Sequence, residues 1–145
     1  MVGFILTGHG HFANGLKSAL DMVAGDQEAF TIVPFEGSAA ATYGDDLRAA
    51  ITAMRAETDG VLVFVDLLGG TPFNQAMMIS ADVDDVQVVT GANLPMLIEL
   101  MLTRANMTLD QLVESAVSVG QAGITHMDLP AATSDDDTLD DGEGL

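Results

Sequence analysis

A histidine flanked by glycines near the N-terminus is the side chain of this sequence best suited to nucleophilic chemistry. His9 lies in the run Thr7-Gly8-His9-Gly10-His11, where the glycines give the imidazole little steric cover and an incoming group can reach it in line. A neutral imidazole carries a proton on one ring nitrogen and a lone pair on the other, and a hydrogen-bond partner decides which nitrogen is which. His9 is therefore a candidate nucleophile if a second group orients its ring.

A second polar segment, Asp66 to Pro72, offers that group. A carboxylate of Asp66 that accepts a hydrogen bond from one ring nitrogen would leave the other free to attack, and would stabilise the positive ring afterwards. Gly69, Gly70 and Thr71 come where a helix is expected to begin, so backbone N–H groups, the helix dipole and the Thr71 hydroxyl would favour an anion. A nucleophile, an orienting carboxylate and an anion pocket together indicate phosphoryl transfer.

Each of these features also has a structural explanation when it is taken alone. A histidine that follows a strand is often part of the packing, and a non-catalytic binding or regulatory domain could keep His9 buried and hydrogen-bonded. Thr71 is a suitable N-cap and Pro72 suits the first helical position, whatever the loop does chemically. The combination of the two segments is what favours the functional interpretation.

The elements that must position these residues alternate between short apolar runs and segments with helical periodicity. The run Val61–Val65 has no polar interruption, which is typical of a central strand buried on both faces of a parallel sheet. We therefore predict an α/β sandwich with a mainly parallel sheet. The expected strands are Val2–Thr7, Phe30–Phe35, Val61–Val65, Val86–Thr90 and a short last strand within Gly123–Leu129. The expected helices are Phe12–Val23 with Gly25 as C-cap, Tyr43–Met54, Phe73–Ala81, Asn93–Arg104, and one that runs from a Thr108/Gln111 capping box to Val119.

Both polar segments follow expected strands at their carboxyl ends. In open α/β sheets ligands bind beyond the carboxyl ends of the strands, near the point where the strand order reverses. If Val2–Thr7 and Val61–Val65 are neighbours in the sheet, His9 and Asp66 can approach each other.

Length and charge limit the classes of function. The chain has 145 residues, the size of one domain, and a net charge of -18, which would repel nucleic acid and anionic membrane surfaces. It has no cysteine for disulfides, thiolate chemistry or cysteine-based zinc sites, no apolar run long enough to span a bilayer, and no recognisable secretory signal. We expect a cytoplasmic protein without membrane insertion, whose protein partners carry basic patches. We expect residues 1–130 to form the domain and residues 131–145 to be an acidic, disordered tail.

Three segments, in order, resemble the enzyme IIA components of the mannose-type bacterial phosphotransferase system (PTS). The first is the run from Phe4 to Leu16, which contains the histidine. The others are Val63–Asn74, with its Gly-Gly-Thr-Pro-Phe-Asn sequence, and Thr90–Leu97. The similarity covers nearly the whole globular part, from about Met1 to Leu129. With it, the expected fold becomes a three-layer sandwich with strand order 2-1-3-4 and a short antiparallel C-terminal strand.

The resemblance implies a phosphotransferase that acts as a histidine phosphocarrier. His9 would accept a phosphoryl group from phospho-HPr and donate it to a IIB component, which serves sugar uptake through membrane IIC and IID partners. Asp66 would orient His9, and Thr71, Gly70, Gly69 and Gly10 would surround the phosphoryl oxygens. The resemblance also implies a homodimer with a C-terminal strand, here near Gly123–Leu129, at the subunit interface. It implies no metal or organic cofactor, and the transported sugar stays open.

Some alternatives remain at this stage. A related branch transfers phosphate to a dihydroxyacetone kinase system, although the Gly-Gly-Thr-Pro-Phe-Asn run favours the sugar-transport branch. A metal-dependent hydrolase could use His9 and His11 with Asp66, but it would need more ligands than this sequence offers, and His126 is the only other histidine. We treat His11 as a residue of the helix start or the rim. Some members of the family are fused to IIB through a linker, whereas this sequence stops after its acidic segment, so we expect a stand-alone IIA.

Overall fold

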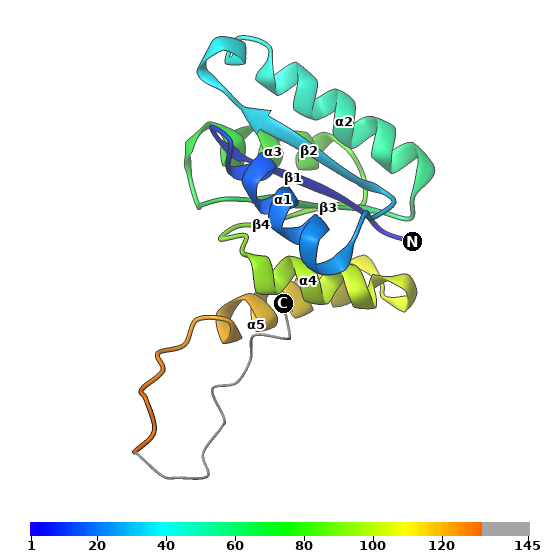
Figure 1. Ribbon diagram of the computed structural model, residues 1–145. Coiled ribbons are helices and arrows are strands. Elements are labelled where there is room, and N and C mark those ends of the chain that lie inside the picture. The colour runs from blue at the N-terminus through cyan, green and yellow to red at the C-terminus, as the bar shows by residue number, and fades with distance from the viewer. Residues whose placement is uncertain (132–145) are drawn as a thin grey trace.

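A four-stranded parallel sheet with helices on both faces forms the centre of the structure, a computed structural model that describes residues 1–131 (Figure 1). The strands are β1 (Gly3–His9), β2 (Phe30–Phe35), β3 (Val61–Val65) and β4 (Val86–Val89). The helices are α1 (Phe12–Ala24), α2 (Tyr43–Glu57), α3 (Gly70–Asp82), α4 (Leu94–Thr103) and α5 (Leu109–Ala122), and single 3₁₀ turns lie at Gly37–Ala39 and Arg104–Asn106.

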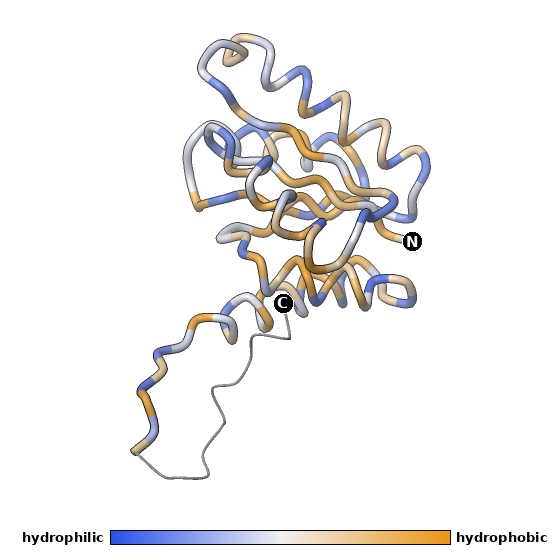
Figure 2. The backbone as a smooth tube through the Cα atoms, viewed as in Figure 1, coloured by the Kyte–Doolittle hydropathy of each residue, from blue (hydrophilic) through white to orange (hydrophobic). Residues whose placement is uncertain are grey.

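The order of the strands is β2-β1-β3-β4, and all pairs are parallel, as predicted. All five residues of β3 are buried, which explains why its sequence is uniformly apolar. Figure 2 shows the hydrophobic strands in the middle of the fold. The direction of the strand order changes between β1 and β3, so the carboxyl ends of these two strands mark the expected ligand site.

Each face of the sheet has its own apolar core. Side chains of β1 and β3 that alternate along the strand separate into the two cores, because successive residues point to opposite faces. On one face Phe4 and Phe64 pack edge to face, 5.0 Å apart, beneath α1, α4 and α5. On the other face Ile5 and Val63 pack against α2 and α3.

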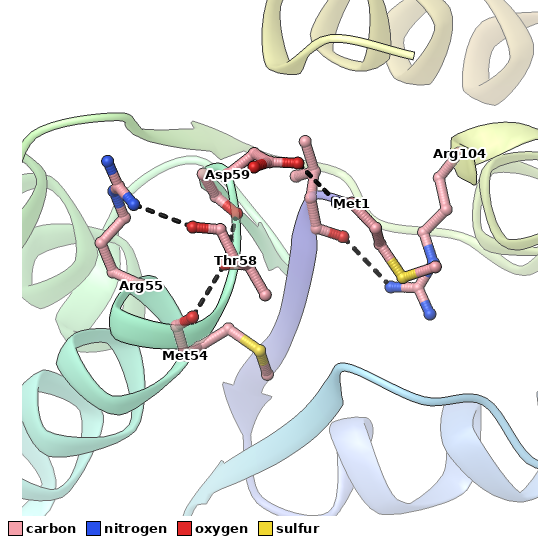
Figure 3. Close-up of polar contacts among 8 residues, drawn as sticks. Met1, Met54, Arg55, Thr58, Asp59 and Arg104 are labelled. Atoms are coloured by element: carbon pink, nitrogen blue, oxygen red, sulfur yellow. Dashed lines mark hydrogen bonds and ion pairs between the residues drawn. The ribbon is translucent and has the colours of Figure 1, made fainter. Parts of the chain in front are cut away.

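The amino end of the sheet is fixed by a group of polar contacts (Figure 3). The Met1 ammonium lies 2.5 Å from Asp59 Oδ2, just before β3, and the buried Arg104 donates to the Val2 carbonyl. Arg55 donates to the Thr58 carbonyl at 2.9 Å, which closes the end of α2. These contacts lie at the end of the sheet opposite His9. They fix the first residues of β1 and β3, and the hydrogen-bonded register between the two strands fixes the residues that follow.

Local sequence signals predicted two of three helix boundaries correctly. The capping box of Thr108 and Gln111 is present at the start of α5, and Gly25 is the C-cap of α1, as predicted. The expected start of α3 was wrong. Gly69 is its N-cap and the helix begins at Gly70, because two glycines with positive φ let the chain turn before Thr71.

The predicted C-terminal antiparallel strand is not found. Residues 124–131 have no regular secondary structure, residues 121–131 are all exposed, and this segment leaves the end of α5 away from the sheet (Figure 1). A strand exists only where a second backbone pairs with it, and no strand of this chain lies beside these residues in the described part. The predicted tail lies outside the described residues, except for Ala131.

No helix within residues 1–131 combines the length and the apolar character that crossing a bilayer requires.

Candidate functional site

The carboxyl ends of β1 and β3 bring His9 and Asp66 into contact. Because Thr7 pairs with Val65 in the parallel register, His9 at the end of β1 and Asp66 directly after β3 lie side by side. Asp66 Oδ2 lies 2.8 Å from His9 Nδ1 and accepts a hydrogen bond from the His9 backbone N–H at 2.9 Å. The approach expected from the sequence is therefore present, and it involves both the ring and the backbone of the histidine.

Asp66 is held as a carboxylate. Burial would raise its pKa, but hydrogen bonds from the His9 N–H, the His9 ring and the Leu67 N–H outweigh burial and keep the pKa below its ordinary value. An ionised carboxylate can only accept hydrogen bonds, so His9 Nδ1 must carry the proton. His9 Nε2 then has the free lone pair.

Glycine at position 8 is required by the closeness of Asp66. A Cβ on Gly8 would lie 2.9 Å from Asp66 Cγ and 2.8 Å from a ring carbon of Phe12. Contacts that short do not occur in folded proteins without movement of a neighbour, so any other residue here would displace the carboxylate. The glycine before the histidine thus serves the pairing with Asp66 in addition to the steric openness expected from the sequence.

Helix α3 begins directly beside the free nitrogen of His9. A Cβ on Gly70 would lie 3.2 Å from His9 Nε2 and 3.1 Å from Cε1, and Gly70 has φ +84°. Gly69 has φ +97°, and together these residues aim the first turn of α3 at the imidazole edge. N–H groups in a first helical turn lack intrahelical partners and, with the helix dipole, attract anions.

Thr71 and Gly10, the other two predicted site residues, flank this position. Thr71 is exposed in the first turn of α3. Gly10 has φ +56°, nothing lies within 4 Å of where its Cβ would be, and its N–H donates to the Phe35 carbonyl at 2.7 Å. Gly10 therefore leaves the histidine accessible, while its own N–H is already used by the fold.

The ring of His9 also contacts an aromatic pair, Phe35 and Tyr43, that the sequence pattern did not single out. Phe35, the last residue of β2, packs edge to face on His9 with ring centres 5.8 Å apart, and it packs in turn on Tyr43 at 4.8 Å. Tyr43 is buried and its hydroxyl lies 2.5 Å from Thr7 Oγ1. Burial, with a smaller contribution from the charge of Asp66, raises the pKa of Tyr43 to about 12. Strand and helix patterns account fully for Phe35 and Tyr43, so no signal separated them from ordinary core residues.

The two neighbouring histidines have different partners. His11 Nε2 lies 2.9 Å from Glu36, and its side chain is 76% exposed at the rim. His9 is paired with Asp66, so the two imidazoles do not converge on one carboxylate. Within residues 1–131 no group of three or more His, Asp or Glu side chains is arranged to hold a metal ion. His9 is thus an imidazole that a carboxylate orients beside a helix N-terminus, an arrangement that suits nucleophilic chemistry.

The chain matches known proteins over most of its length. The family model of the PTS system fructose IIA component, EIIA-man, matches residues 3–117. The fructose-specific PTS EIIA component of Bacillus subtilis (strain 168) is 31% identical over 122 residues, which are 83% of this chain and 83% of that protein. The mannose-specific PTS EIIAB component of Escherichia coli (strain K12) is 34% identical over 125 residues, which are 85% of this chain and 38% of that longer protein.

Solved structures show the same fold. The phosphotransferase system component EIIA from Streptococcus agalactiae aligns with a TM-score of 0.78 and 33% identity, over 87% of this chain and 97% of that one. The mannose/sorbose-specific IIA subunit of the phosphotransferase system from Enterococcus faecalis aligns with a TM-score of 0.77 and 30% identity, over 90% and 98%.

Proposed function

Since the chain belongs to the mannose-type family of PTS IIA components, we propose that His9 is the residue on which this phosphotransfer subunit carries its phosphoryl group. The donor would be phospho-HPr and the acceptor a IIB component, which passes the group to sugar that enters through membrane IIC and IID partners. The proposal places the chain in the cytoplasm and treats residues 1–130 as one IIA domain. It assigns no choice of sugar to this chain, which handles only the phosphoryl group.

The observation that supports the proposal most directly is the hydrogen bond between Asp66 and His9 Nδ1, 2.8 Å long, with Nε2 facing the start of α3. In the transfer step, the Nε2 lone pair attacks phosphorus and forms a P–N bond. The bond from phosphorus to the donor atom breaks, and the donor leaves with the electron pair. Because Nδ1 keeps its proton, the ring becomes positive, and the ionised Asp66 stabilises that charge.

The phosphoryl oxygens would lie at the first turn of α3. Gly69 and Gly70 supply backbone without side chains, and Thr71 supplies a hydroxyl and an N–H group beside the position where negative charge accumulates. Gly10 contributes by adding no side chain next to the histidine, since the space where its Cβ would lie is open. Backbone and hydroxyl donors of this kind suit a group that must be held briefly and passed on.

A phosphorylation assay tests the proposal. We would incubate the chain with phosphoenolpyruvate, enzyme I and HPr and measure the intact mass. We expect one added phosphoryl group, stable in alkali and labile in acid, that is lost in His9→Ala. The matched control is His11→Ala, since His11 is two positions away and exposed at the rim; it should accept the group as the parent does. No uptake by the parent, or equal uptake by His9→Ala, would contradict the proposal.

We also propose that the chain forms a homodimer in which residues 124–129 of one copy pair with the β4 edge of the other. β4 is the last strand of the sheet, and beside it lies a groove of about 590 Å³ lined by apolar side chains that include Phe73, Val88 and Val117. Ile124, Met127 and Leu129 are 74–81% exposed in the single chain. Such an apolar segment would be stabilised by an edge strand and an apolar groove of a second copy.

A further inference from the structure

Two residues outside the reacting pair, Phe35 and Tyr43, form a continuous support beneath the ring of His9. Phe35 makes the only aromatic contact of the imidazole within residues 1–131, and Tyr43 packs on Phe35. Asp66 restrains the ring at Nδ1 alone, and the side chain of His9 is 46% exposed. A ring held at one atom can still tilt about that hydrogen bond, so the surface against which it rests decides where Nε2 points.

The backbone fixes Phe35 relative to His9. The two residues are register partners of β1 and β2, and partners in a parallel pair project to the same face of the sheet. The Gly10 N–H donates to the Phe35 carbonyl at 2.7 Å, directly after the histidine. The backbone of Phe35 therefore cannot move away from His9 unless the end of the sheet opens.

Tyr43 packs on Phe35 and is itself bound to Thr7 of β1, the strand that carries His9. The hydroxyl of Thr7 donates its only proton to the Val33 carbonyl at 2.5 Å, so the hydroxyl of Tyr43 must be the donor in its contact with Thr7. Thr7 and Tyr43 are both buried, and Thr7 lies two residues before His9 on the same face of β1. The contacts run from Thr7 to Tyr43, from Tyr43 to Phe35 and from Phe35 to His9, so this chain of four side chains begins and ends on β1.

We propose that Phe35 is a positioning residue for phosphoryl transfer, and that the buried Tyr43–Thr7 contact holds it so that His9 Nε2 stays directed at the first turn of α3. This inference rests on the proposed function of His9. Displacement of a reacting atom by about 1 Å can slow an enzymatic step by as much as about a hundredfold, so a loss of this support is measurable.

Phe35→Leu tests the inference, with Phe30→Leu as the matched control. Phe30 lies at the other end of β2, is likewise partly buried and packs in the opposite core, so both variants lose the same atoms from the same strand. We expect Phe35→Leu to lower the rate at saturating phospho-HPr about tenfold, with the KM for phospho-HPr changed less than about twofold. Phe30→Leu should keep the parent rate at any temperature where it is folded.

The orientation of the ring is measured separately by nitrogen-15 NMR of the imidazole in the unphosphorylated protein. The parent should show one tautomer, with the proton on Nδ1, and Phe35→Leu should show shifts averaged between two tautomers and faster ring motion. Tyr43→Phe removes a single oxygen, and it should shift the same signals in the same direction; it serves if Phe35→Leu does not fold. Phe30→Leu should match the parent.

Unchanged His9 signals and parent rates in both Phe35→Leu and Tyr43→Phe would overturn the inference. A parent that accepts no phosphoryl group would overturn the proposed function instead. The NMR comparison needs no phosphoryl donor, so it would still decide whether Phe35 and Tyr43 orient the ring.

Discussion

At the scale of single residues, the arrangement of the site depends on the hydrogen bonds that the Asp66 carboxylate accepts. Asp66 receives three: from the His9 ring, the His9 N–H and the Leu67 N–H. The first decides which nitrogen of the imidazole is protonated, and the other two hold the carboxylate in place. In the proposed transfer, orientation of His9 and stabilisation of its later positive charge would therefore come from the same side chain.

Asp66→Asn should slow phosphorylation of His9 by at least about tenfold while the protein stays folded. An amide has one acceptor atom where three donors converge. In one orientation its NH₂ faces the Leu67 N–H, and in the other it faces His9 and favours the tautomer with the proton on Nε2. Rapid-quench measurements with phospho-HPr give the rate, and circular dichroism checks the fold. A parent-like rate would show that Asp66 is not the orienting group.

Tyr43 allows a second measurement at this scale, because it is the only tyrosine of the chain. Its pKa is raised to about 12, chiefly by burial. An unfolded chain would lose this proton near the ordinary pKa of about 10, so between these values the unfolded state binds fewer protons and stability falls as pH rises. Below about pH 10 the contribution is fully present.

Tyrosinate absorbance during an alkaline titration should therefore rise only near pH 12, or earlier if the protein unfolds first. Chemical denaturation at several pH values should show stability that declines above about pH 10 in the parent and declines less in Tyr43→Phe. Ionisation near pH 10 in a folded protein would contradict the burial of this hydroxyl.

At the scale of elements, the start of α3 and the end of β1 meet with almost no space between them. Gly70 combines a positive φ with a position against His9 Nε2, so it carries a conformational and a steric requirement at once. The two requirements can be separated, since other glycines of the chain have only the first.

Gly70→Ala should destabilise the protein by about 1–2 kcal/mol and reduce phosphorylation of His9 by more than about tenfold. The new methyl group would lie 3.2 Å from Nε2, in the space that the proposed function assigns to the phosphoryl group. The control is Gly25→Ala, at φ +76° with nothing within 4 Å, which should lose similar stability and keep its activity. Equal activity of both variants, measured by intact mass over time, would show that Gly70 does not face the reacting nitrogen.

The segment after α5 gives a further prediction at this scale. Ile124→Asp combined with Leu129→Asp should convert the proposed dimer into a monomer, because charges would replace apolar side chains that the dimer buries. Met22→Asp, at an 85% exposed position on α1, is the control and should remain dimeric. Sedimentation equilibrium reads out the mass, and a monomeric parent or a dimeric double variant would contradict the arrangement.

At the scale of the whole molecule, the net charge is -18, and each of the four Lys and Arg side chains already has a partner within the protein. Lys17, Arg48 and Arg55 each pair with an aspartate, and the buried Arg104 donates to backbone carbonyls and packs on the ring of Phe4. The remaining acidic side chains repel one another across the surface. A partner that brings basic residues would be attracted to this protein from any side, so the site itself must provide the selectivity of docking.

Stability should rise with salt concentration. Between about 0.1 M and about 1 M KCl the screening length falls from about 10 Å to about 3 Å, which removes most repulsion between exposed carboxylates. We expect the Tm to increase by several degrees over this range. A double variant, Glu99→Gln with Glu114→Gln, alters two exposed acids on α4 and α5 and should be more stable than the parent only at low salt. A Tm that does not change with salt would contradict this explanation.

The amino-acid sequence alone determined the parts of this protein that depend on neighbours along the chain. Alternation of apolar runs and helical segments gave the α/β sandwich and its parallel sheet, and the capping box at Thr108 is a local hydrogen-bond pattern that works in any context. The types of residue around His9 and Asp66 indicated phosphoryl chemistry, because nucleophile, carboxylate and glycine turn are recognisable without coordinates.

Contacts between distant segments decided the rest. The glycines at 69 and 70 begin α3 earlier than Thr71 suggested, since the loop must reach the imidazole. The expected last strand is absent because pairing needs a second backbone, and periodicity cannot supply one. Phe35 and Tyr43 look like ordinary core residues in the sequence, and only the packing of β2 and α2 against the end of β1 places them under His9. Side chains far apart in the chain become a site only when the fold fixes their distances, and local patterns carry no information about those distances.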